Sequence, residues 1–246
     1  MTTRIVCAGD SNTRGEYGVG YVGLLGERWH GRGIDVVAEG VNGDTSHNLL
    51  RRLDPIVARR PDAVTVLIGS NDVWGSLTEA NGRRLMRRKE LPEPPTPDGY
   101  RDRLGAIVAR LVGETDARVA VLSPPVLGQD LDGPAVRAGE RFAEAAREVA
   151  EARGVAYLPL FERQSRYLRE SGARPVPLPD GLRERYTSVL QHRLLRRSYD
   201  AISDRRGLAL TTDFVHQNSR GAAMIADLVD GFVRQEAAPS PAQPEV

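Results

Sequence analysis

The segment RIVCAGDSNTRG at residues 4–15 begins with a short apolar run and ends in a cluster of turn-forming residues. The apolar run, Ile5 to Ala8, has the length of a buried β-strand, and Gly9-Asp10-Ser11-Asn12 ends it. Ser11 is therefore expected at the carboxyl end of a central strand, where open α/β sheets bind their ligands. A serine in this place is either a helix cap or a nucleophile, and the other residues near it decide which.

The same pattern of an apolar run followed by turn-forming residues recurs along the chain. Such runs predict strands at residues 34–38, 63–68, 118–122 and 155–158. Apolar residues at helical spacing predict helices at residues 17–30, 46–59 (with a restart at Pro55), 100–113, 134–153 and 224–232. This alternation predicts an α/β fold in three layers, α/β/α, around a mostly parallel five-stranded sheet with right-handed crossovers.

The sequence predicts a single domain over residues 1–236, with insertions at about 73–99 and 161–206. Both insertions contain proline clusters, and each also has a helix-like stretch, at residues 77–90 and 182–194. We expect the first insertion to cross the carboxyl-end face of the sheet as a lid or a substrate wall. Residues 237–246, with three prolines, are too polar to pack and are expected to be a disordered tail.

Composition excludes several classes of partner. Lys and Arg total 34 against 33 Asp and Glu, so the net charge of +1 provides no field for nucleic acid. No apolar run has the length of a membrane span, and residues 1–4 do not resemble a signal peptide, so a cytoplasmic location is expected. Cys7 is the only cysteine, and no cluster of residues has the spacing of metal ligands. The sequence leaves the oligomeric state open.

Five residues far apart in the chain are expected to meet at one edge of the sheet. Ser11, Gly43 and Asn71 follow the first three predicted strands, and Asp213 and His216 precede the last helix. Because the loops that follow parallel strands emerge on the same side, these residues converge. Acyl transfer needs a nucleophile, a base, a group that orients the base and donors for an oxyanion. Ser11, His216 and Asp213 can supply the first three, and Gly43 and Asn71 can supply the donors.

Four segments together resemble a known family. They are Gly9-Asp10-Ser11, Gly43, Gly69-Ser70-Asn71-Asp72 and Asp213-Phe214-Val215-His216, which are similar to the four blocks of the SGNH/GDSL hydrolases. The resemblance spans Gly9 to Gly221, although the two insertions match no pattern of the family. It implies a flavodoxin-like domain, ester hydrolysis by a Ser-His-Asp triad, and an oxyanion hole made of the Ser11 N–H, the Gly43 N–H and the Asn71 side chain.

Other interpretations of these residues are weaker. Ser11 could be only a helix cap, and Gly43 and Asn71 could be only turn formers. Gly18 to Gly23 form a GxGxxG, but about ten residues separate it from the first strand, whereas a dinucleotide loop follows its strand directly. The basic run at residues 83–89 is expected to be a solvated helix face, with docking of an acidic substrate or partner as an alternative.

We therefore expect a serine hydrolase that cleaves a small-molecule carboxylic ester through an acyl-enzyme, with no cofactor and no metal. Val73 and Trp74, which follow Asn71, are expected to line the substrate pocket. Two alternatives stay open. The same acyl-enzyme could react with an alcohol or amine, as in an acyltransferase, or the chain could be a binding module on an inactive hydrolase scaffold.

Overall fold

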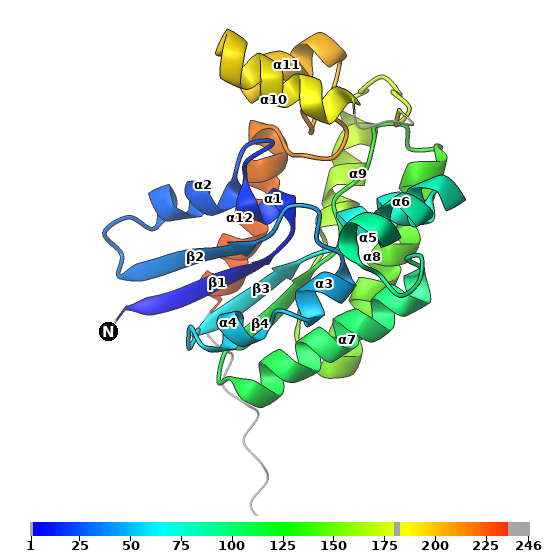
Figure 1. The fold of residues 1–246 in the computed structure, drawn as a ribbon. Coiled ribbons are helices and arrows are strands. Elements are labelled where there is room, and N and C mark those ends of the chain that lie inside the picture. The colour runs from blue at the N-terminus through cyan, green and yellow to red at the C-terminus, as the bar shows by residue number, and fades with distance from the viewer. Residues whose placement is uncertain (1, 180–182, 236–246) are drawn as a thin grey trace, which may run out of the picture.

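The computed structural model describes residues 2–179 and 183–235 and contains one sheet of five parallel strands (Figure 1). The strands are β1 (Thr3–Gly9), β2 (Ile34–Gly40), β3 (Ala63–Leu67), β4 (Arg118–Leu122) and β5 (Ala156–Leu158), in the order β2-β1-β3-β4-β5. This is the flavodoxin-like strand order. The predicted fold class is confirmed, and all five strands lie where the apolar runs predicted them.

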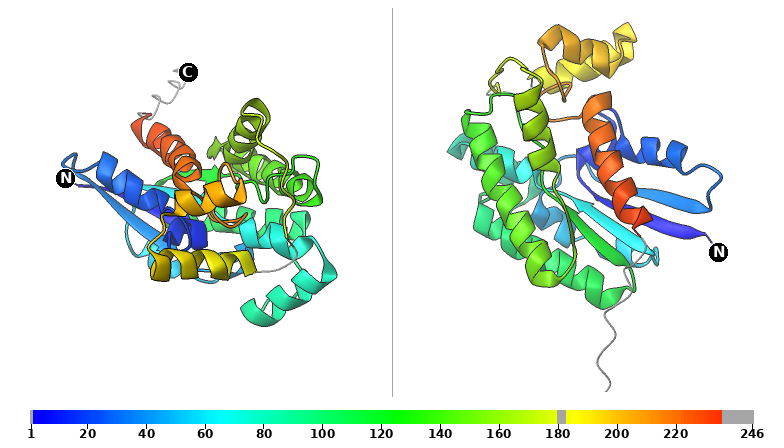
Figure 2. Two further views of the ribbon diagram at one scale, coloured as in Figure 1. Left: turned by 90° about the horizontal axis from the view of Figure 1, so that it is seen from above. Right: turned by 180° about the vertical axis from the view of Figure 1, so that it is seen from behind.

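Helices cover both faces of the sheet, and β1 shows how the two cores are separated. Val6 and Ala8 point into one core, and Ile5 and Cys7 point into the other. The first core includes α3 (Ser46–Leu50), α4 (Asp54–Val57), α5 (Ser70–Ser76), α7 (Pro97–Glu114) and α8 (Pro134–Arg153). The second includes α2 (Tyr21–Arg28), α9 (Leu160–Glu170) and α12 (Ser219–Arg234), as Figure 2 shows from two further sides.

The two predicted insertions are more helical than expected. The first contains the end of α5 and all of α6 (Glu79–Lys89), and the second contains α9, α10 (Arg183–Leu195) and α11 (Tyr199–Arg206). The proline clusters at residues 91–97 and 175–179 separate these helices, because proline cannot continue a helix. The start of the predicted helix at Leu182 and the predicted tail at residues 237–246 lie outside the described residues.

The α10–α11 pair stands apart from the three layers and is tied to two loops of the sheet (Figure 1). The hydroxyl of Tyr199 donates to the carbonyl of Glu16 at 2.9 Å. The guanidinium of Arg206 donates to the carbonyl of Thr212 at 2.6 Å and to the hydroxyl of Ser188 in α10 at 2.5 Å. Of the helices that the structure describes, none is long and apolar enough to cross a lipid bilayer.

Gly18, the first glycine of the GxGxxG segment, has a packing role. The chain at Gly18 and Val19 approaches the segment before α12, where the N–H of Val19 donates to the carbonyl of Gln217 at 2.8 Å. A Cβ at Gly18 would lie 2.4 Å from that carbonyl oxygen, whereas a Cβ at Gly23, within α2, would have nothing within 4 Å. Gly18 is therefore required by a close approach of two backbones, and not by a nucleotide.

Replacing these two glycines by alanine is expected to have opposite effects on stability. Gly18→Ala forces the two backbones apart and should lower the free energy of unfolding by about 1–3 kcal/mol. Gly23→Ala should raise it by about 0.5–1 kcal/mol, because alanine is the better helix former and the site is open. Urea unfolding of both variants beside the wild type measures this, and equal effects would contradict the packing role.

Candidate active site

Ser11 is held at the end of β1 by a short helix, α1 (Ser11–Arg14). The carboxylate of Asp10 caps this helix and accepts from the N–H of Asn12 at 2.9 Å. Gly15, at a φ of 75°, ends the helix in the left-handed conformation that glycine adopts without strain. Ser11 itself is only 3% exposed, so its hydroxyl lies in a protected place with a fixed backbone.

Asp213 and His216 lie in one tight turn before α12. One oxygen of the Asp213 carboxylate accepts from the backbone N–H of His216 at 2.8 Å and of Val215 at 3.2 Å. The other oxygen lies 2.7 Å from Nδ1 of the His216 ring. Between them, Phe214 has a φ of 73°, a left-handed conformation that is uncommon outside glycine and that reverses the chain within this turn.

The turn brings His216 to Ser11. The distance from Nε2 of His216 to Oγ of Ser11 is 2.9 Å, across 205 positions of sequence. When the ionised carboxylate of Asp213 accepts the Nδ1 proton, the lone pair of Nε2 faces the serine hydroxyl. The ring of Tyr17 meets the His216 ring edge-on, with centroids 5.1 Å apart, and limits how the imidazole can turn.

Gly43 lies in the loop after β2 and Asn71 in the first turn of α5, and these two segments contact each other. The side-chain amide of Asn71 donates one hydrogen to the carbonyl of Asp44 at 2.9 Å, which leaves its second hydrogen for another acceptor. Gly43 has a φ of 78°. Both residues line a hollow of about 20 Å³ together with Trp74 and Lys89. The structure thus places the two predicted oxyanion donors beside one small space.

The loop that contains Gly43 is held by an ion pair on each side of Asp44. Lys89, the only lysine of the chain, donates to the carbonyl of Asn42 at 2.8 Å and to the Asp44 carboxylate at 2.9 Å. The guanidinium of Arg52 donates to the other Asp44 oxygen at 2.7 Å and to the carbonyl of Gly9 at 2.8 Å. The expectation that residues 83–89 form only a solvated face is therefore wrong at Lys89, whose side chain is 17% exposed.

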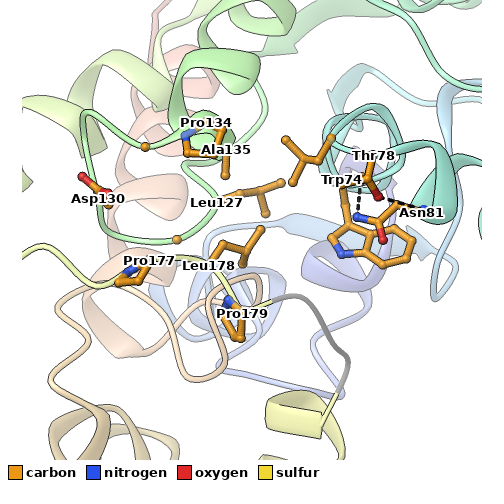
Figure 3. Close-up of a pocket in the computed structure, with 13 residues that line it drawn as sticks. Trp74, Thr78, Asn81, Leu127, Asp130, Pro134, Ala135, Pro177, Leu178 and Pro179 are labelled. Atoms are coloured by element: carbon orange, nitrogen blue, oxygen red, sulfur yellow. Dashed lines mark hydrogen bonds between the residues drawn. The ribbon is translucent and has the colours of Figure 1, made fainter.

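Trp74 and Val73, the two predicted pocket residues, point in different directions. Trp74 lines the small hollow at Gly43 and a second, apolar hollow of about 140 Å³, which Figure 3 shows between Trp74 on one side and Leu127 and Leu178 on the other. Val73 is fully buried in the hydrophobic core. The expectation that Val73 lines the pocket is corrected, because neighbouring positions of a helix face different sides.

Tyr17 and Lys89 are site residues that the sequence argument missed. Nothing in the sequence singles out Tyr17, because its contact with His216 depends on the backbone approach at Gly18. Lys89 could have been singled out from the sequence, because it is the single lysine in a chain rich in arginine. Among the residues that the structure describes, no group of three or more His, Cys, Asp or Glu could hold a metal ion.

The buried carboxylate of Asp72 holds the start of α3. It accepts from the backbone N–H of Ser46 at 3.0 Å and from the Ser46 hydroxyl at 2.6 Å. Burial raises the pKa of Asp72 from 3.8 to about 6, and the Ser46 hydrogen bonds only partly oppose that rise. Burial also raises the pKa of Asp10. Both carboxylates are next to site residues in the sequence and brace the loops that position them.

Known proteins share this sequence pattern. The model of the GDSL-like lipase/acylhydrolase family matches residues 7–224. An acetylxylan esterase of Geobacillus stearothermophilus is 30% identical over 145 residues, which are 56% of this chain and 61% of that protein. The match therefore spans less than two thirds of the relative's length.

Solved structures share the fold. An acetyl xylan esterase, AlAXEase, superposes with a TM-score of 0.68 at 18% identity, over 94% of this chain and 99% of its own. Axe2, an acetylxylan esterase of Geobacillus stearothermophilus, has a TM-score of 0.64 at 20% identity, over 95% of each chain. The lipase/acylhydrolase of Enterococcus faecalis has a TM-score of 0.61 at 19% identity, over 98% of this chain and 100% of its own.

The sheet is flavodoxin-like, a serine stands at the end of its first strand, and an aspartate–histidine turn precedes its last helix. These features define the class of protein, a hydrolase of the esterase type. The chain belongs to the GDSL-like lipase/acylhydrolase family, because that family model covers most of its length. The resemblance stated from the four sequence segments is confirmed.

The raised pKa of Asp72 predicts a dependence of stability on pH. The folded state holds the Asp72 proton more tightly than the unfolded state, so stability is highest below pH 4 for this group and falls as the pH rises to about 6. Wild type should therefore lose about 3 kcal/mol relative to Asp72→Asn across this window. Urea unfolding at pH 4 to 7 measures this.

The variant Asp98→Asn serves as the control, since the Asp98 side chain is 84% exposed. Its stability should follow the wild-type curve. A constant difference between wild type and Asp72→Asn at every pH would show that Asp72 has an ordinary pKa.

Proposed function

We propose that this protein hydrolyses a carboxylic ester through an acyl-enzyme on Ser11. The observation that supports this most directly is the continuous contact from Asp213 to His216 to Ser11, at 2.7 Å and 2.9 Å. These are the distances at which a base takes a proton from a nucleophile and a carboxylate orients that base. Membership of the GDSL-like lipase/acylhydrolase family supports the same reaction.

In the first step, Oγ of Ser11 bonds to the ester carbonyl carbon while Nε2 of His216 takes the hydroxyl proton. The tetrahedral intermediate collapses, the bond to the alkoxide oxygen breaks, and His216 returns the proton to the departing alcohol. Water then attacks the acyl-enzyme with the same histidine as base, and the carboxylic acid leaves. Asp213 stabilises the imidazolium and keeps the ring oriented, without itself taking up the proton.

The developing oxyanion is stabilised by donors that the fold holds in advance. The Ser11 N–H, the Gly43 N–H and the free hydrogen of the Asn71 amide are the donors that we assign. Asp44 supports two of them, since its carbonyl accepts from Asn71 and its carboxylate is held by Lys89 and Arg52. Such preorganised donors act without reorganisation as charge develops.

The small hollow at Gly43 and Asn71 favours a short acyl group. Its volume of about 20 Å³ leaves room for little more than a methyl group beside the carbonyl. The relatives named as acetylxylan esterases support an acetyl ester as substrate. Hydrolysis is the reaction that we propose over acyl transfer, because the family is one of lipases and acylhydrolases. The cytoplasmic location stays a prediction.

Substitution of Ser11 and Asn71 tests the reaction. On p-nitrophenyl acetate, Ser11→Ala should lower kcat on the order of 10⁴-fold or more, because the nucleophile is lost. Asn71→Ala should lower kcat by about 10²–10³-fold, the effect of one oxyanion donor. A fluorophosphonate probe should add its mass to wild type and to the control Ser171→Ala, but not to Ser11→Ala. Labelling of Ser11→Ala, or its full activity, would refute the assignment.

Lys89→Met tests the support of the oxyanion loop. Loss of the ammonium frees the carbonyl of Asn42 and one oxygen of Asp44, so the Gly43 N–H should be less well placed. We expect kcat on p-nitrophenyl acetate to fall about tenfold with KM nearly unchanged, because the donor acts mainly in the transition state. Arg87→Met, an exposed neighbour on α6, should change neither constant. A rise in KM alone would assign Lys89 to substrate binding.

A further inference from the structure

A wide hollow lies between the catalytic loops and α10. It has a volume of about 610 Å³, and its walls come from three separate parts of the chain. Glu16 and Tyr17 come from the loop after α1, Arg88 comes from α6, and the remaining lining residues all come from α10. Because the ring of Tyr17 contacts the ring of His216, one wall of this hollow is the immediate neighbour of the proposed base.

The wall that α10 provides is mainly apolar, with Thr187 and Arg193 as its polar members. Tyr186, Leu190 and Leu194 line the hollow and are 60%, 57% and 70% exposed. They are spaced four residues apart, so they form one stripe along the helix. Single exposed apolar residues are ordinary, but a contiguous stripe that faces a hollow indicates a place where another apolar group binds.

This wall is held in place relative to the catalytic turn. Arg206 joins the hydroxyl of Ser188, in α10, to the carbonyl of Thr212, the residue before Asp213. Tyr199 bonds the carbonyl of Glu16, the neighbour of Tyr17. The hydroxyl of Thr212 also donates to the carbonyl of Tyr17 at 3.3 Å. The stripe and the catalytic residues are therefore parts of one hydrogen-bonded unit.

The proposed mechanism decides which part of an ester this hollow can receive. His216 must protonate the departing alcohol, so the alcohol leaves on the side of the histidine, where Tyr17 and the hollow are. The carbonyl oxygen points to Gly43 and Asn71, beside the much smaller hollow. Arg88 lines both hollows, so the two spaces share one wall residue.

We propose that the hollow between Tyr17 and α10 is the leaving-group site, and that it takes an apolar alcohol, alkyl or aryl, esterified to a short acyl group. This inference rests on the proposed function and deepens it by naming the substrate class. The alcohol chain lies against Tyr186, Leu190 and Leu194, while the acyl group stays beside Gly43. Selectivity by chain length should then appear in the alcohol and not in the acyl group.

Two series of esters test this on the purified full chain, with proton release as the readout. In the acetates of ethanol, butanol, hexanol and octanol, kcat/KM should rise about twofold per methylene, since partial burial recovers about half of the transfer free energy of a methylene. In the ethyl esters of acetic, butyric, hexanoic and octanoic acid, kcat/KM should fall with length. The reverse pattern would overturn the proposal.

Variants of α10 connect the selectivity to the stripe. Leu190→Asn and Leu194→Asn should each lower the ratio of kcat/KM for octyl acetate to that for ethyl acetate by about tenfold. Leu195→Asn is the matched control, because Leu195 is 58% exposed on the same helix but does not line the hollow, and the ratio should not change. An equal effect of all three substitutions, or no effect of any, would refute the assignment.

A second copy of the chain is the other occupant that this stripe could have. Light scattering of wild type and of the double variant Leu190→Asn/Leu194→Asn measures this. A loss of mass in the variant with an unchanged octyl-to-ethyl ratio would assign the stripe to a subunit interface and overturn the proposal. Fluorophosphonate labelling of Ser11 tests the proposed function separately. If Ser11 is labelled but kcat/KM shows no selectivity for chain length, only the proposed leaving-group site is refuted.

Discussion

The carboxylate of Asp213 makes two kinds of interaction on which the site depends. One oxygen closes the turn by accepting the backbone N–H groups of Val215 and His216, and the other orients the imidazole. The same group therefore sets both the path of the chain and the direction of the ring. Because Ser11 is fixed separately by β1 and the Asp10 cap, the 2.9 Å contact between Ser11 and His216 depends on where this turn sits.

The position of that turn is set by contacts with distant parts of the chain. Val19 bonds Gln217 where only a glycine at position 18 allows the approach, and Arg206 bonds Thr212 from the α10–α11 pair. On the opposite side, Arg52 joins the end of β1 to Asp44, and Asp44 is bonded by Asn71 and Lys89. Buried and partly buried polar groups thus fix loops that the parallel sheet only brings to the same edge.

The sequence was sufficient for features that depend on local patterns. Each strand is an apolar run ended by turn formers, and the convergence of Ser11, Gly43 and Asn71 follows from their places after parallel strands. Asp213 and His216 were identified by their spacing of three residues and by the resemblance to the family segments. It was not sufficient where the outcome depends on long-range packing. The burial of Lys89 against Asp44, the inward side chain of Val73 and the contact of Tyr17 with His216 require knowledge of how separate loops meet. Helix α9 was missed because the proline cluster at residues 175–179 follows it, and α11 was missed because it has few apolar residues.

The sheet and the two insertions supply different parts of the site. The groups that we assign to the chemistry stand on loops of the sheet, whereas the larger hollow is walled mainly by α10 and by Arg88 of α6, both from insertions. Arg206 and Tyr199 of the second insertion bond the backbone carbonyls of Thr212 and Glu16 and not the side chains that react, so these two side chains connect the insertion to the loops next to the proposed base. Under the proposed function, residues of α10 such as Leu190 and Leu194, which line the hollow, can change which alcohol fits while the reacting groups keep their places.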